Sequence, residues 1–199
     1  MHGLENLDPH AAAQQGLAVL MGIALASTCG LRAFLPLLVV SLLAWTGHAQ
    51  LGESFGWMGT PLAALCFGSA VLVELIGDKI PAVDHALDAA GIVVKPVAAT
   101  LTTASMVTHF DPMLALTLGV MTGGVAAEGV HLTKAKARVM SSALTGTVAN
   151  PILSVIEDIV SLIGVIMAVL VPVTVVLGAV GFVAFVWLWR RSRRPQPAT

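Results

Sequence analysis

The sequence predicts an all-α integral membrane protein with about seven (six or seven) transmembrane or half-transmembrane helices. Three observations lead to this prediction: an apolar composition, a series of long apolar stretches, and basic residues confined to one side of the membrane. Of 199 residues, 57% are hydrophobic and only 11% are charged, and the mean hydropathy is +0.91. A soluble domain carries about 25% charged residues because its surface must be solvated. Most of the surface of this chain is therefore expected to face lipid.

The apolar stretches are separated by short polar segments. They cover residues 12–29, 32–47, 58–77, 92–109, 112–132, 150–170 and 174–189. A helix needs about 20 apolar residues to cross the hydrocarbon core, with about 17 as a minimum. The stretches 32–47 and 174–189 are short and 12–29 is marginal. These three are interpreted as tilted helices, half-helices or re-entrant segments.

The basic residues predict the orientation. When the chain is threaded from an outer N-terminus, all ten Lys and Arg residues fall on one side of the membrane. They are Arg32, Lys79, Lys95, Lys134, Lys136, Arg138, Arg190, Arg191, Arg193 and Arg194. Basic residues are retained on the cytoplasmic side, so the C-terminus is expected inside. We therefore predict one polytopic domain over residues 1–190 and a basic cytoplasmic tail over residues 191–199.

Composition also argues against several classes of protein. A net charge of −1 without a clustered basic face gives no indication of a nucleic-acid partner. Residues 1–31 contain no Lys or Arg, so we do not expect the first apolar stretch to be a cleavable signal peptide. Cys29 and Cys66 both lie in apolar stretches, which favours buried thiols over a disulfide.

Two segments of the chain share a pattern that predicts an internal repeat. The matched residues are Glu74, Lys79, Gly91 and Pro96 in one copy, and Glu128, Lys134, Gly146 and Pro151 in the other. Each copy is interpreted as a helix with a carboxylate near its inner end, a break at Gly, and a new helix opened by Pro. Gly30 and Pro36 would form a third, degenerate copy. Two or three parallel helix-break-helix repeats are expected, with chance similarity as the alternative.

Three segments resemble a known family. TCGLRAFLP (28–36), GDKIPAVDHALD (77–88) and NPILSVIED (150–158) are similar to the signature segments of an uncharacterised family of small bacterial inner-membrane proteins, a domain-of-unknown-function family. The resemblance spans nearly the whole chain. It implies a multi-pass protein of the bacterial inner membrane, and it implies no activity and no cofactor.

Charged side chains near hydrocarbon are the candidates for function, because each costs roughly 2.5–3.5 kcal/mol at mid-membrane. The candidate substrate or ion ligands are Glu74, Asp78, Asp84, Asp88, Glu128, Glu157, Asp158, Arg32 and Asn150. Glu74 and Glu128 are expected about one turn inside the C-terminal ends of their helices, where the helix dipole disfavours a carboxylate. Each glutamate therefore needs a partner. That partner is either part of a functional site or a nearby lysine, Lys79 for Glu74 and Lys134 for Glu128.

Glu157 and Asp158 follow Asn150, which is interpreted as a helix cap, and would lie roughly 10 Å into that helix. They are interpreted either as a functional pair or as a buried ion pair with Arg32. Asp84 and Asp88, spaced i, i+4, could bind a divalent cation or simply form a solvated face.

Histidines and hydroxyls receive plainer interpretations. His85, His109 and His131 are interpreted as ordinary interfacial residues rather than metal ligands. The hydroxyl residues of segment 100–108 could line a polar path or pack against neighbouring helices. The small-xxx-small patterns are expected to form packing seams. These patterns are Gly22, Ala26 and Gly30, and Gly119 with Gly123.

These features favour a small transporter or channel-like carrier for a proton or cation, with carboxylates near the cytoplasmic side. One alternative is a non-catalytic structural or lipid-handling membrane protein. The other is an interfacial lipid-modifying enzyme similar to the CDP-alcohol phosphatidyltransferases, although the Asp-Gly and Ala-Arg elements of their motif are missing. Enzymatic activity is therefore not expected, and no cofactor is indicated. The expected partners are the lipid bilayer, a proton or cation, and a second copy of the chain.

Overall fold

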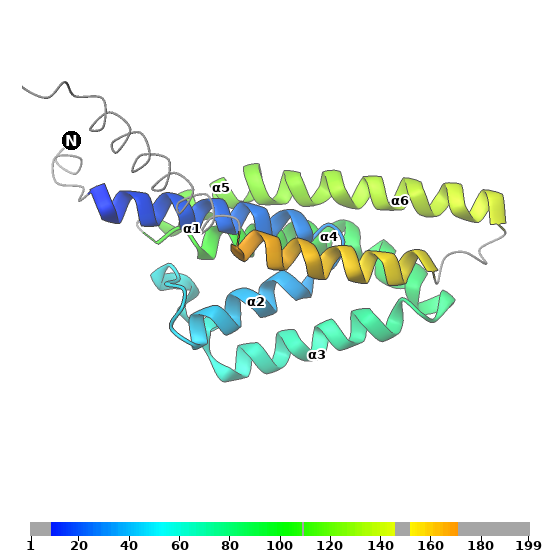
Figure 1. Cartoon of the computed structure of the whole chain (residues 1–199), viewed down its shortest axis with the longest axis horizontal. Coiled ribbons are helices and arrows are strands. Elements are labelled where there is room, and N and C mark those ends of the chain that lie inside the picture. Colours follow the sequence, from blue (N-terminus) through cyan, green and yellow to red (C-terminus); the bar gives the residue numbers. More distant parts are fainter. Residues whose placement is uncertain (1–8, 109, 146–151, 171–199) are drawn as a thin grey trace, which may run out of the picture.

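The structure, a computed structural model, describes residues 9–108, 110–145 and 152–170, and this part of the chain is helical without strands (Figure 1). The elements in order are α1 (Pro9–Thr28), α2 (Phe34–Trp45), the 3₁₀ segment η1 (Glu53–Gly59), α3 (Pro61–Gly77), α4 (Pro81–Ser105), α5 (Pro112–Gly119), the π-helical segment η2 (Val120–Gly124) and α6 (Val125–Thr145). A further helix covers Ile152–Leu170. The expected all-helical architecture is confirmed for the described residues.

Three of the described helices are long and apolar enough to cross a membrane: Val83–Ser105, Pro112–Leu144 and Ile152–Leu170. A fourth span results if η1 and α3, which are bent by 66° at their junction, count as one. These four correspond to the four longer apolar stretches of the sequence, and α1 and α2 correspond to the two shorter stretches at the start of the chain. The stretch 174–189 lies outside the described residues.

The first two helices form a short hairpin. Figure 1 shows that the turn between α1 and α2 lies part-way along the bundle, short of the end that α3, α4 and α6 reach. The 12 residues of α2 rise only about 18 Å, against about 30 Å for a hydrocarbon core. Of the alternatives left open by the sequence, α2 matches a half-helix. Its N-terminus therefore lies inside the bundle.

The predicted break between Gly91 and Pro96 is wrong. Helix α4 runs without interruption from Pro81 to Ser105, with Pro96 inside it. An internal proline removes one backbone hydrogen bond, and packed membrane helices tolerate this because neighbouring groups satisfy the freed carbonyl.

The expected position of Glu128 is also wrong. Glu128 lies in the first turn of α6, inside the continuous helix Pro112–Leu144, and not near a helix C-terminus. The apolar helix continues through η2 into α6, and so it extends beyond the position where the repeat pattern predicted its end. Gly146 and Pro151 lie outside the described residues, so the break in the second copy stays a prediction, whereas the first copy has no break.

The small residues form packing seams, as expected. A Cβ atom on Gly119 would lie 2.6 Å from the carbonyl oxygen of Thr100, and one on Gly123 would lie 2.7 Å from the carbonyl oxygen of Ala99. Only glycine allows η2 and the end of α5 to approach α4 so closely.

The hydroxyl residues of α4 serve this packing. The hydroxyl of Thr100 donates to the carbonyl of Pro96 (2.8 Å), and that of Thr102 donates to the carbonyl of Ala98 (2.8 Å). Ser105 likewise donates to Thr102 at 3.0 Å. Because these hydroxyls are satisfied within their own helix, the packing interpretation is supported for this part of the segment.

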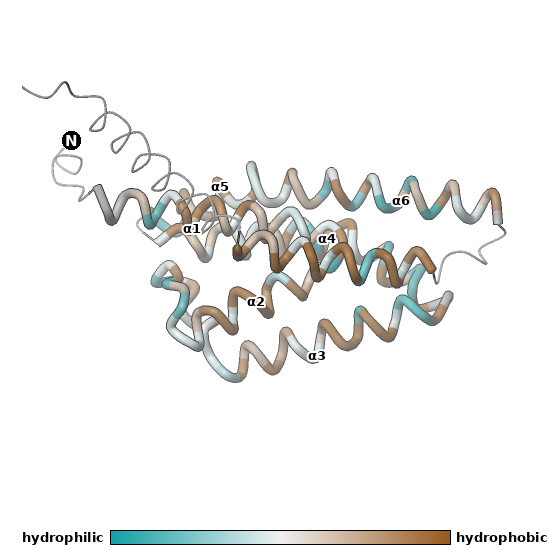
Figure 2. Tube along the Cα trace, viewed as in Figure 1, coloured by the Kyte–Doolittle hydropathy of each residue, from teal (hydrophilic) through white to brown (hydrophobic). Residues whose placement is uncertain are grey.

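The outer face of α3 is apolar and exposed, with Leu62, Leu65, Leu72 and Ile76 each more than half exposed. Figure 2 shows apolar residues along most of the bundle. Such a continuous apolar surface is typical of a protein whose helices face lipid. Cys66 belongs to this exposed surface, whereas Cys29 is buried, and both thiols are free. The expectation of two buried thiols is thus correct for Cys29 only.

Candidate functional site

Charged side chains from five segments meet toward one end of the bundle. The segments are the turn before α2, the end of α3 with the turn that follows it, α4 from Asp84 to Lys95, the middle of α6, and the first half of helix Ile152–Leu170. The acidic members are Glu74, Asp78, Asp84, Asp88, Glu157 and Asp158, and the basic members are Arg32, Lys79, Lys95, Lys134 and Arg138. We call this set the charge network. Figure 2 shows hydrophilic positions near the end of the bundle where α3 joins α4.

Two helices carry matching polar faces. The face of α4 carries residues at i, i+4, i+7 and i+11, namely Asp84, Asp88, Gly91 and Lys95. The face of α6 carries residues at i, i+3 and i+7, namely His131, Lys134 and Arg138. These spacings put each set on one side of its helix. The two helices pack together, so acids of α4 meet bases of α6.

Arg32 is the first centre of the network. Its side chain is only 3% exposed, and its guanidinium donates to the carboxylate of Asp78 at 2.6 Å and to that of Asp158. It also donates to the backbone carbonyl of Glu74 at 3.1 Å. Of the two alternatives left open by the sequence, the ion pair with Arg32 is thus found for Asp158, whereas Glu157 pairs with Lys134 and Arg138. Asp78 is an additional partner of Arg32.

Glu74 has a partner of a different kind. Its two carboxylate oxygens accept hydrogen bonds from the backbone N–H groups of Ala33 (2.9 Å) and Phe34 (3.1 Å). These groups belong to the N-terminus of α2, where backbone donors lack intrahelical partners and the dipole attracts an anion. The expected need for a partner is therefore met by a helix N-terminus, and not by Lys79.

Arg138 is the second centre. It donates to Asp84, to Asp88 at 3.1 Å, and through two nitrogens to both oxygens of Glu157 at 3.1 and 2.9 Å. Lys134 lies 3.0 Å from Glu157 and 3.6 Å from Asp88. Asp84 and Asp88 therefore bind a guanidinium. Among the residues that the structure describes, no group of three or more His, Cys, Asp and Glu side chains is arranged to hold a metal ion.

Asp78 connects the two centres, because Arg138 lies 3.6 Å from the oxygen that Arg32 binds. Asp78 directly follows α3, outside the candidate spans. Burial raises the pKa of its carboxyl, although the cations of Arg32, Lys134 and Arg138 act in the opposite direction.

Lys79 closes the network at its more exposed side. Its ammonium donates to the carboxylate of Asp158 at 2.8 Å and to the hydroxyl of Ser154 at 2.6 Å. Asp158 therefore has two basic partners, Arg32 and Lys79.

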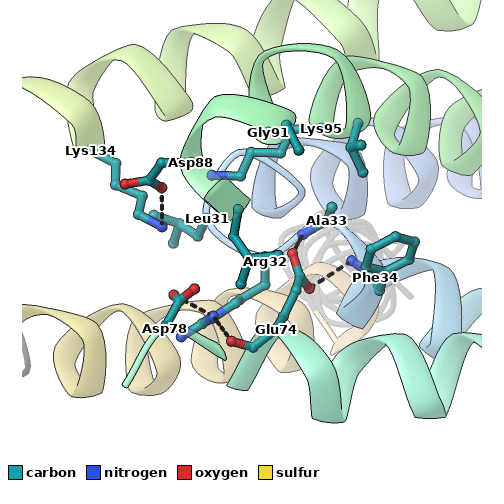
Figure 3. A pocket seen from close by; sticks show the side chains of 13 residues that line it. Leu31, Arg32, Ala33, Phe34, Glu74, Asp78, Asp88, Gly91, Lys95 and Lys134 are labelled. Atoms are coloured by element: carbon teal, nitrogen blue, oxygen red, sulfur yellow. Dashed lines mark hydrogen bonds and ion pairs between the residues drawn. The ribbon is translucent and has the colours of Figure 1, made fainter. Parts of the chain in front are cut away.

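A small cavity of about 60 Å³ lies within the network (Figure 3). Its polar lining consists of Arg32, Glu74, Asp78, Asp88, Lys95 and Lys134. Such a volume has room for a few water molecules. The side chain of Asp88 is 32% exposed, whereas that of Asp78, which also lines the cavity, is 5% exposed. Asp88 is therefore a natural contact between the cavity and solvent.

Not every predicted residue joins this site. Glu128 does not line the cavity, and its Oε2 atom is buried without a hydrogen-bond partner among the described residues. Asn150 lies outside the described residues. The structure brings the other candidates together: Arg32, Glu74, Asp78, Asp84, Asp88, Glu157 and Asp158.

The basic residues Lys95, Lys134 and Arg138 of α4 and α6 were not predicted to belong to the site, although Lys134 was considered as a partner of Glu128. Their signal was present in the spacing, because Lys134 and Arg138 are separated by four residues, as are Asp84 and Asp88. The contact between Lys95 Nζ and His131 Nδ1, which are 2.9 Å apart, was not predicted either. His131 is buried in that contact, and not interfacial as expected.

The comparisons with known proteins identify a family and no activity. A family model described as "Domain of unknown function (DUF4126)" matches residues 19–191. Neither the comparison with curated proteins nor that with solved structures gives a match.

Proposed function

Because the chain belongs to this domain-of-unknown-function family, which brings no activity with it, we propose a function from the geometry of the site. The protein is a small multi-pass carrier or channel that moves protons through the charge network, in the bacterial inner membrane. The basic end of the bundle faces the cytoplasm and the N-terminus lies outside. The sequence left transport of another small cation open as well, but the contacts of the carboxylates support protons.

One observation carries the proposal: buried acids and bases with shared partners surround a cavity of water size. Asp158 is shared by Arg32 and Lys79, and Glu157 by Lys134 and Arg138. When one of these carboxylates takes up a proton, its basic partners keep other polar contacts. Arg32 keeps Asp78 and Lys79 keeps Ser154. Arg138 keeps Asp84, and Lys134 lies near Asp88. A proton can therefore enter without leaving a buried charge uncompensated, which would be costly.

The choice of the proton follows from how the carboxylates are engaged. Asp84, Asp88 and Glu157 all accept from Arg138, so they are not free to surround a metal cation with oxygen ligands. Water molecules in the cavity would instead connect Asp88 with the buried groups. A proton needs only such a chain of donors and acceptors.

Proton flux into liposomes tests the proposal. The purified protein is reconstituted with an enclosed pH-sensitive dye, and a potassium gradient with valinomycin drives protons inward. We expect the wild type to acidify the lumen and Glu157→Gln to reduce the rate by about tenfold or more. Glu53→Gln is the matched control, because Glu53 is an exposed acid of η1 outside the network. Wild-type flux equal to that of empty liposomes would refute proton transport.

A structural role is the second candidate, because the same ion pairs hold five segments together. Under that role the wild type shows no flux, and Glu157→Gln lowers the melting temperature without any activity to lose. Measuring both quantities on the same preparations separates the two functions. Potassium, sodium and magnesium flux assays on the wild type distinguish protons from another cation.

A further inference from the structure

Lys95 differs from the other buried basic residues. Arg32, Lys134 and Arg138 each form ion pairs, whereas Lys95, at 4% exposure, forms none within the described ranges. An ammonium group without a counter-ion is costly to bury. A lysine in such surroundings exchanges its proton readily, as lysines that act as bases do. Lys95 is therefore the member of the site best suited to alternate between charged and neutral forms.

Among the described residues, the hydrogen-bond partner of Lys95 is itself titratable. Lys95 Nζ lies 2.9 Å from His131 Nδ1, and both side chains are buried. A hydrogen bond between two nitrogens needs one of them to accept, so a fully protonated lysine and a fully protonated histidine cannot coexist in this contact. The two residues thus share one excess proton and titrate as a pair.

Gly91 makes room for this pair. A Cβ atom on Gly91 would lie 3.1 Å from Lys95 Cε and 3.4 Å from His131 Cε1. Gly91 lies one turn before Lys95 on the polar face of α4, and in Figure 3 both line the same wall of the cavity. A side chain at this position would crowd the contact without removing any titratable group.

The pair adjoins the cavity through Lys95, and His131 shares α6 with the acid Glu128. On the cavity side, Lys95 shares the lining with Glu74 and Asp88. Glu128 precedes His131 by about one turn of α6. Its Oε2 atom is buried and has no hydrogen-bond partner in the described part. The remaining charged neighbours that act on the pair are Lys134 and Glu157.

We propose that Lys95 and His131 relay protons between the cavity and Glu128, along the interface of α4 and α6. This relay rests on the proposed proton transport and adds a route that leads from the cavity through Lys95 and His131 to Glu128. It also gives Glu128 a role, as the proton acceptor beyond the cavity.

The proton balance of the relay is simple. The carboxylate of Asp88 takes up a proton from solvent and passes it through a cavity water to the neutral amine of Lys95. Lys95 becomes an ammonium, and Asp88 returns to the carboxylate. The ammonium passes that proton to Nδ1 of neutral His131, which becomes an imidazolium while Lys95 returns to the amine. The imidazolium turns and releases the same proton to the carboxylate of Glu128. His131 is then neutral again, and Glu128 is a carboxylic acid.

Three variants test the relay in the proteoliposome assay. His131→Gln keeps an oxygen that can accept from Lys95 but cannot carry a proton, and we expect flux to fall by about tenfold or more. Lys95→Met should have the same effect. Gly91→Ala should slow flux by separating the pair, although alanine favours the helix. Its matched control is Gly129→Ala on α6, where a Cβ atom meets nothing within 4 Å, and which should conduct as the wild type does.

Three readouts decide the outcome. Nitrogen NMR of labelled histidine should find His131 Nδ1 unprotonated in the wild type, and changed in Lys95→Met. If the wild type conducts and both His131→Gln and Gly91→Ala conduct equally well, the relay is refuted and the proposed function stands. If the wild type does not conduct, the proposed function fails and the relay fails with it. If flux falls only in variants whose melting temperature also falls, the pair is structural and the relay is refuted.

Discussion

Arg138→Met is the most informative substitution for the stability of the charge network. Arg138 neutralises Asp84, Asp88 and Glu157. Without it, Lys134 still lies 3.0 Å from Glu157 and 3.6 Å from Asp88. Asp84 has no other ion pair among the described residues, so this one buried carboxylate loses its counter-ion. Breaking a buried pair in this way destabilises by about 3–5 kcal/mol.

The loss is measured as a shift of the melting temperature in detergent. For a chain of this size each kcal/mol corresponds to about 2–4 °C, so we expect a decrease of roughly 6–20 °C. Lys136→Met is the matched control, because it removes the same charge from an exposed position of the same helix. Adding Asp84→Asn to Arg138→Met should restore part of the stability, since it removes the uncompensated charge. Equal melting temperatures for Arg138→Met and Lys136→Met would refute the reasoning.

Two further predictions concern packing and orientation. Gly123→Ala should destabilise the protein by about 1–3 kcal/mol, because its Cβ would lie 2.7 Å from a backbone oxygen of α4. Gly129→Ala is the control and should leave the stability unchanged. Thermal unfolding of both variants checks this, and equal stability would contradict the close approach of η2 to α4. In a cysteine-free background, an impermeant thiol reagent added to intact cells should label Ser54→Cys and not Lys136→Cys; the reverse labelling would invert the orientation.

The apolar helices that are long enough to cross a membrane could be predicted from composition and from the lengths of the apolar stretches. Helix boundaries set by strong local signals were also predictable, such as the end of α3 after Glu74. The pairing of Arg32 with Asp158 followed from charge and expected depth, although 126 positions separate them. In each case a property of one segment, or a simple rule of charge, was sufficient.

The predictions that failed depended on which helices pack together. Gly91 and Pro96 are typical of a helix break, yet α4 continues through both, because neighbouring helices bury and support it. The contact of Lys95 with His131 could not be predicted without knowing that α4 lies against α6. Gly91, which was interpreted as a helix end, instead provides the space for that contact.

The site contains two kinds of polar interaction with different consequences. The first holds together two helix ends buried within the bundle: the carboxylate of Glu74 accepts from the N-terminus of α2, while Arg32 donates to the carbonyl of Glu74 at the end of α3. Buried helix ends without such partners would be unstable, so these two residues are needed for folding whatever the protein does.

The second kind lies along α4 and α6, where Asp88 is partly exposed and Lys95 has no ion-pair partner within residues 9–108, 110–145 and 152–170. Burying an ammonium group in such surroundings opposes folding. A purely structural design would place an apolar residue there, because an apolar side chain of similar volume packs without the cost of desolvation. Lys95→Met should therefore leave the melting temperature unchanged or raise it, whereas Arg32→Met should lower it. A difference in sign between the two variants would distinguish a residue needed for folding from one needed for the proposed proton relay.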